Sequence, residues 1–245
     1  MAVITDSLLH RTEESSILAI DSAFDMCSVA CLRADLSDIR MSSQRRKHAD
    51  DILMLVQSLL QTHQLALTDF DAIAMTSGPG SFTGLRIGTA VVQGLAFGSQ
   101  RPVLCVSSLA ALAVSASRAQ AAEYVAVCLH AREDEFYFGI YRLSADGAGE
   151  SLINDCMATA DKIDNLLGAF ASSQHHAALA TGDGWQHPLL QPTVLKYDLI
   201  PVTANYDALI IADIARQQWQ AGKSGVPAAL ASPVYLKDEL DYRTV

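Results

Sequence analysis

The chain has 245 residues, of which 50% are hydrophobic and 18% charged, and its formal net charge is −10 at pH 7. This length can bury a core in one large domain or two smaller lobes without the support of disulfides or metals. Affinity for nucleic acid comes mainly from Lys and Arg side chains that neutralise phosphates, so an acidic chain should bind RNA poorly alone. No apolar run approaches the ~18 residues that a membrane span requires, and we expect no membrane contact.

The cysteines and the first residues indicate a cytoplasmic protein. The cysteines are odd in number and scattered, a pattern typical of free thiols in a reducing compartment: Cys27, Cys31, Cys105, Cys128 and Cys156. Residues 1–16 lack the apolar region of a secretory signal, and we expect a flexible leader there. The basic run at residues 45–48 is interpreted as a solvated loop leading into a helix, or as an RNA contact within a larger assembly.

In the first half of the chain, short apolar runs alternate with helical patterns. Residues 17–20 and 28–32 predict a hairpin. Residues 48–63 predict an amphipathic helix, because apolar residues recur at helical spacing at Ile52, Leu53, Val56, Leu59 and Leu60. A buried strand at 72–75 leads through a glycine-rich loop at 77–84 into a helix at 82–97, and a strand follows at 103–106.

The second half continues the alternation, which indicates an α/β protein. We expect a helix at 107–122, antiparallel strands at 124–129 and 136–143, a helix at 161–170 and a short strand at 177–181. A helix at 206–220 is predicted to begin at Asn205 as its N-cap, and residues 232–236 should be extended.

Three segments could hold a phosphate. In the loop at 77–84, glycines at a strand-to-helix junction let backbone N–H groups approach an anion, although no Lys follows as in a P-loop. Asp21 ends the first strand, and Gly182-Asp183-Gly184 follows a later one. Each of these segments is equally compatible with ordinary turn chemistry.

The helix after the loop carries small residues at four-residue spacing. Gly80, Gly84 and Gly88 form one series, and Gly94 and Gly98 form another. Glycine within a helix costs up to ~1 kcal/mol relative to alanine, so a series of glycines needs a reason. Close approach of another helix is such a reason, either by internal packing or at a subunit interface.

Three segments together resemble the TsaB (YeaZ) family: Ile17-Leu18-Ala19-Ile20-Asp21-Ser22, the block from Ser77 to Gly88, and Pro233-Val234-Tyr235-Leu236. The resemblance covers the chain from about residue 17 to its end. It implies an actin/Hsp70-like (ASKHA, ribonuclease H-like) fold with two lobes, the second much reduced. The expected divisions are a leader at 1–16, a first lobe at 17–106 on which the helix at 205–221 packs, a second lobe at 107–204, and a tail at 222–245.

The same resemblance implies a non-catalytic partner in making threonylcarbamoyladenosine on tRNA, which binds and stabilises the catalytic TsaD subunit. A TsaE-type P-loop ATPase completes such a complex, the chain alone would form a homodimer, and tRNA would be met only through the complex. The two predicted helices of the first lobe would form the interface. The predicted interface residues are Ile52, Leu53, Val56, Leu59, Leu60, Leu85, Arg86, Gly88, Thr89, Val92 and Ala96.

We expect no catalytic residue and no metal site, because no two of the seven histidines have the H-x-x-x-H spacing of TsaD-type enzymes. We also expect no cofactor beyond weak or vestigial ATP or ADP binding. The residues for such binding would be Asp21, Ser22, Gly78, Gly80, Ser81, Gly182 and Gly184. The alternatives are an independent actin-like ATP-dependent transferase or kinase and a metal-dependent endopeptidase.

Overall fold

The structure, a computed structural model, describes residues 15–42, 48–144, 149–173 and 178–236. The chain divides into two compact units. The first contains Met1–Ala111 and Tyr206–Val234, and the second contains Leu112–Asn205 and Tyr235–Val245. Helix α4 (Ser108–Ala119) begins in the first unit and ends in the second.

The first unit is a mixed sheet with strand order β3-β2-β1-β4-β5. Its strands are β1 (Ile17–Asp21), β2 (Ser28–Leu32), β3 (Ser37–Met41), β4 (Ala72–Gly78) and β5 (Val103–Ser107). Every residue of β1, β2 and β4 is buried. These strands read as continuous apolar runs because helices cover both faces of the sheet.

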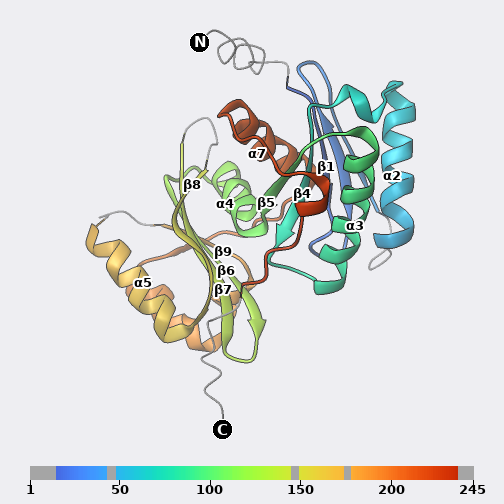
Figure 1. Cartoon of the computed structure of the whole chain (residues 1–245). Helices are drawn as coiled ribbons and strands as arrows, with labels where there is room; N and C mark the ends of the chain where they lie inside the picture. Colours follow the sequence, from blue (N-terminus) through green and yellow to red (C-terminus); the bar gives the residue numbers. More distant parts are fainter. Residues whose placement is uncertain (1–14, 43–47, 145–148, 174–177, 237–245) are drawn as a thin grey trace, which may run out of the picture. The chain divides into compact units, whose positions relative to one another are not determined.

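Two helices lie on one face of this sheet and one on the other (Figure 1). Helices α2 (His48–His63) and α3 (Phe82–Ser99) pack side by side, and α7 (Ala208–Gln220) covers the opposite face. The short helix η1 (Leu67–Asp69) connects α2 to β4. The core between α2, α3 and the sheet includes Ile52, Leu59 and Val92, all fully buried.

The second unit is built on the sheet β10-β9-β6-β7-β8. Its strands are β6 (Tyr124–Arg132), β7 (Glu135–Leu143), β8 (Gly149–Thr159), β9 (Leu179–Thr181) and β10 (Ile200–Pro201). Helix α5 (Ala160–Ser173) and the short helices η2 (Asp183–Gln186), η3 (Pro188–Leu190) and α6 (Gln191–Lys196) complete it. Phe136, Phe138 and Leu190 are fully buried in its core.

Backbone hydrogen bonds hold residues 226–234, which we call the tail, against the rest of the first unit. Val226 and Val103 exchange two hydrogen bonds of 2.8 Å, and the Val234 N–H donates to the Ser77 carbonyl at 2.8 Å. Between them, η4 (Ala228–Leu230) packs on α3, and the Gln93 side chain donates to the Ala231 carbonyl at 2.8 Å. The tail therefore runs beside α3 and the end of β4.

Most of the predicted elements are confirmed, and the main errors have simple causes. The helix at 48–63 and the antiparallel pair β6–β7 are found as predicted. The predicted N-cap of α7 is wrong: Asp207, not Asn205, accepts from the Leu209 and Ile210 N–H groups. Strands β3 and β8 were not predicted, because β3 has no buried residue, β8 is mostly exposed, and neither carries a clear apolar pattern.

Two predictions fall on residues outside the described ranges, namely the leader up to residue 14 and the basic residues 45–47. All five cysteines are free thiols. Among the described residues, the structure contains no helix of the length and apolar character needed to cross a membrane.

Candidate functional site

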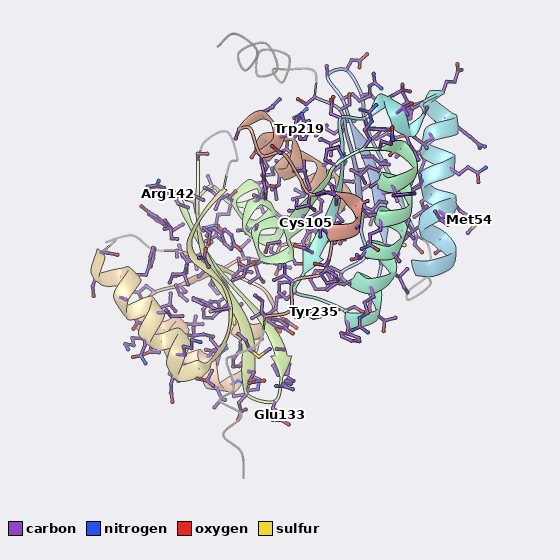
Figure 2. The ribbon with its side chains drawn as sticks, viewed as in Figure 1. Met54, Cys105, Glu133, Arg142, Trp219 and Tyr235 are labelled. Atoms are coloured by element: carbon purple, nitrogen blue, oxygen red, sulfur yellow. The ribbon has the colours of Figure 1, made fainter. Side chains whose placement is uncertain are left out.

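The outer side of α2 and α3 exposes large apolar side chains. We define the outer face as Leu53, Met54, Ala90, Gly94, Phe97 and Gly98, all of which are exposed. Leu53 is 51% exposed, Met54 59% and Phe97 81%. Figure 2 shows Met54 at the outer edge of α2, away from the sheet. Exposed side chains of this size on neighbouring helices are typical of a protein-binding surface.

The glycines of α3 separate into two groups. A Cβ on Gly88 would lie 2.1 Å from Ser22 Oγ, and a Cβ on Gly80, just before the helix, would lie 2.4 Å from the Ala23 carbonyl oxygen. A Cβ on Gly94 or Gly98 would meet nothing within 4 Å. Internal packing therefore explains Gly80 and Gly88. No contact of the described chain explains Gly94 or Gly98, although each costs up to ~1 kcal/mol of helix stability relative to alanine.

The predicted interface residues lie mostly on the inner side of the two helices. Leu53 and Arg86 are exposed and Leu60 is half-buried. The others are buried in the first unit itself: Ile52, Val56, Leu59, Leu85, Gly88, Thr89, Val92 and Ala96. In this conformation their side chains hold α2 and α3 on the sheet, and the exposed surface of the two helices is the outer face. Helical periodicity identifies the core-facing stripe of a helix, not the surface beyond it.

Polar groups gather where β1 and β4 end. Asp21, 4% exposed, accepts at Oδ1 from Thr76 Oγ1 at 2.6 Å and from the Ala23 N–H at 3.1 Å. The Tyr206 ring packs edge-on against Phe24, with 5.6 Å between ring centroids. The Tyr206 hydroxyl lies beside the Ser108 and Thr76 hydroxyls. Thr76, Ser108 and Tyr206 were not predicted, because isolated hydroxyl residues carry no sequence signal.

Burial dominates the electrostatics of this cluster. Desolvation raises the pKa of Asp21 from 3.8 to about 6, although the hydrogen bond from Thr76 opposes the shift, and the charge of Asp207 raises it further. Burial and the charge of Asp21 raise the pKa of Tyr206 well above its ordinary value. In the folded first unit, burial therefore makes ionisation of the Asp21 carboxyl group less favourable than it is in water.

The residues predicted for phosphate binding in the first unit contact one another. Ser22 Oγ donates to the Gly84 carbonyl at 2.9 Å, and the Ser81 N–H donates to the Ala23 carbonyl at 2.7 Å. Ser81 Oγ caps α3 by accepting from the Gly84 N–H. Gly78 has a φ of 101°, and a Cβ there would lie 3.0 Å from Leu85 Cδ1. The space that Gly80 and Gly88 leave is filled by Ala23 and Ser22, so neither glycine position has room for a side chain.

In the second unit, Gly182 and Gly184 pack on β6. Their Cβ atoms would lie 2.1 Å from the Cys128 carbonyl oxygen and 2.6 Å from Cys128 Sγ. Between them, Asp183 Oδ1 accepts from the His130 N–H at 3.0 Å. Close approach of the backbone accounts for both glycines of this turn.

Within residues 15–42, 48–144, 149–173 and 178–236, no group of three or more His, Cys, Asp or Glu side chains could hold a metal ion.

Comparison with known proteins assigns this architecture. The family model described as TsaD, tRNA N6-adenosine threonylcarbamoyltransferase, matches residues 39–221. YeaZ from Pseudomonas aeruginosa has 36% sequence identity and a TM-score of 0.75, with 91% of this chain and 100% of that chain covered. The chain is thus a two-lobed α/β protein of the actin/Hsp70-like class, as predicted.

Two relatives make the assignment more specific. The tRNA threonylcarbamoyladenosine biosynthesis protein TsaB of Escherichia coli (strain K12) is 32% identical over 231 residues, which are 93% of this chain and 96% of that protein. The TsaB protein of Haemophilus influenzae is 30% identical over 238 residues, with the same two coverages. The chain belongs to the TsaB family.

Proposed function

We propose that this chain is a non-catalytic partner in the threonylcarbamoyladenosine modification of tRNA, at the adenosine beside the anticodon. It binds and stabilises a TsaD-type catalytic subunit through the outer face of α2 and α3. The observation that carries the proposal is the pair of exposed glycines, Gly94 and Gly98, beside the 81% exposed Phe97. Open glycine backbone next to a large aromatic side chain suits close packing against a second helix.

The family match favours a partner of related fold. A model for the transferase family covers residues 39–221, so this chain and a TsaD-type subunit share an architecture. Two related folds that meet through equivalent helices form a pseudo-twofold interface, and two copies of this chain would form the true twofold version. We therefore propose a homodimer when the chain is alone, replaced by a heterodimer when the catalytic subunit is present.

A net charge of −10 favours an indirect role in tRNA binding. Phosphate contacts need a surplus of Lys and Arg, so the RNA would be held by the complex and not by this chain alone. A TsaE-type ATPase is proposed as the third member, and a cytoplasmic location follows from that assembly.

We propose that the chain needs no cofactor of its own. Ser22 and Ala23 pack directly against Gly88 and Gly80, and Asp21 is already hydrogen-bonded to Thr76. These contacts argue against the rival function of an independent ATP-dependent transferase or kinase. The endopeptidase alternative has no residue constellation in its favour among the described residues.

Calorimetry tests the proposal with two titrations. The chain titrated with the TsaD-type subunit of the same organism should give saturable binding at micromolar concentrations or tighter. The same chain titrated with ATP and Mg²⁺ should give no saturable heat at those concentrations. Absence of binding to the catalytic subunit would contradict the proposed function, and tight ATP binding by the chain alone would favour the transferase alternative.

A further inference from the structure

The loop that follows β1 is bonded to the first turns of α3. Ser22, 3% exposed, donates from Oγ to the Gly84 carbonyl at 2.9 Å. Ala23 accepts at its carbonyl from the Ser81 N–H at 2.7 Å and donates its own N–H to Asp21 Oδ1 at 3.1 Å. The polar groups of this loop thus join the end of β1 to the start of α3.

Glycines make this contact close. A side chain at Gly88 would collide with Ser22 Oγ at 2.1 Å, and one at Gly80 would collide with the Ala23 carbonyl oxygen at 2.4 Å. Gly88 lies in the body of α3, where glycine is less favourable than alanine. The helix therefore loses intrinsic stability at a position where it rests directly on Ser22.

The same helix carries the outer face. Gly84 and Gly88 face Ser22, whereas Ala90, Gly94 and Phe97 are exposed. On its flank, the Gln93 side chain holds the Ala231 carbonyl of the tail. Close helix packing has interior-like density, so a small displacement of α3 would change the fit of any helix laid on Gly94.

We propose that Ser22 is a positioning residue for partner binding: it holds the first turns of α3 so that the exposed side of the helix fits the partner. The affinity part of this inference rests on the proposed function. Ser22 itself is buried, so we assign it no direct contact with the partner. Its influence passes through Gly84 and Gly88 to the rest of the helix.

Ser28→Ala is a matched control for Ser22→Ala. Ser28 is 2% exposed, lies on the same hairpin, and accepts at Oγ from the Ala208 N–H of α7 at 2.9 Å. Each substitution removes one buried serine hydrogen bond, but only Ser22→Ala releases α3. The two variants should lose similar stability in denaturant.

Calorimetry with the TsaD-type subunit should then separate them. Ser22→Ala should weaken binding by about tenfold, the equivalent of one lost buried hydrogen bond. Ser28→Ala should bind as tightly as the wild type. Equal losses of affinity in the two variants would reduce Ser22 to a general stabilising role and overturn the proposal.

We call the contact by which Ser22 holds the first turns of α3 the clamp. Amide hydrogen exchange of the isolated chain tests this clamp without a partner. In Ser22→Ala the amides of Leu85 to Val92 should exchange faster than in the wild type, and in Ser28→Ala they should not. Unchanged exchange in Ser22→Ala overturns the clamp even if partner binding is intact. If Ser22→Ala exchanges faster but the wild-type chain binds no TsaD-type subunit, the proposed function is contradicted while the clamp stands.

A double substitution gives a second readout. Gly88→Ala should lower the denaturation midpoint strongly in the wild type, where the new Cβ meets Ser22 Oγ at 2.1 Å. In the Ser22→Ala background the nearest atom is the Cβ of residue 22, at 3.2 Å, so the loss should be much smaller. If the stability losses of the two single variants simply added up in the double variant, Ser22 and Gly88 would not act as a unit.

Discussion

Replacing Gly94 by leucine should abolish partner binding while leaving the isolated chain at least as stable as the wild type. A Cβ added at Gly94 meets nothing within 4 Å and the position is exposed, so we expect the isolated chain to accommodate the larger side chain. Glycine to leucine within a helix gains up to ~1 kcal/mol of helix stability. The added side chain would hold a second helix away from α3, and we expect at least a ~100-fold loss of affinity, typical of a disrupted interface centre.

The control for Gly94→Leu is Ala169→Leu, a small-to-leucine change at an exposed position of α5 in the second unit. It should leave both stability and affinity near wild-type values. Thermal unfolding and calorimetry with the TsaD-type subunit measure the two quantities. A Gly94→Leu protein that binds like the wild type would remove α3 from the interface.

Replacing Asp21 by asparagine should stabilise the chain at neutral pH. Burial raises the pKa of Asp21 from 3.8 to about 6, so the folded state binds a proton more tightly than the unfolded state. Stability contributed by that proton is full below pH ~4 and is lost as pH rises to about 6. A shift of about two units corresponds to about 3 kcal/mol, the expected upper limit of the gain in Asp21→Asn at pH 7.5.

The asparagine Oδ1 can still accept from Thr76 and Ala23, so the substitution removes the charge and keeps these hydrogen bonds. Urea unfolding of both proteins between pH 4.5 and 7.5 measures the difference. The difference in free energy of unfolding between the Asp21→Asn protein and the wild type should be small at pH 4.5 and grow toward pH 6.5. Asp38→Asn is a control of opposite sign, because the hydrogen bond to His63 lowers the pKa of Asp38 and its ionised form stabilises the fold. A less stable Asp21→Asn protein at pH 7.5 would contradict the expected cost of burying this charge.

The elements of the fold could be predicted where burial imposes a pattern. The stripe of Ile52, Val56 and Leu59 and the apolar run of β4 appear in the sequence because each must face a core. Strands β3 and β8 lie at the edges of their sheets, β3 with no buried residue and β8 mostly exposed, so nothing forces a pattern on them. The cap of α7 is decided by which side-chain oxygen reaches the first N–H groups, and composition alone does not distinguish Asn205 from Asp207.

The candidate site was harder to predict because one helix has two sides with different roles. The glycine spacing drew attention to α3, but the sequence does not show that Ser22 fills the space at Gly88 while the space at Gly94 is open. Met54 and Phe97 lie outside the apolar stripes, where a sequence pattern gives no reason to select them. The cluster around Asp21 depends on Thr76 and Tyr206, which are 55 and 185 positions away along the chain.

The most direct test of the account is reconstitution of threonylcarbamoyladenosine formation on tRNA from purified components, with each protein left out in turn. Product should form with the TsaD-type subunit, the TsaE-type ATPase and this chain together, and this chain alone should form none. The omission of this chain should abolish product. Undiminished product without it, or modification of tRNA by this chain unaided, would contradict the role of a required, non-catalytic partner.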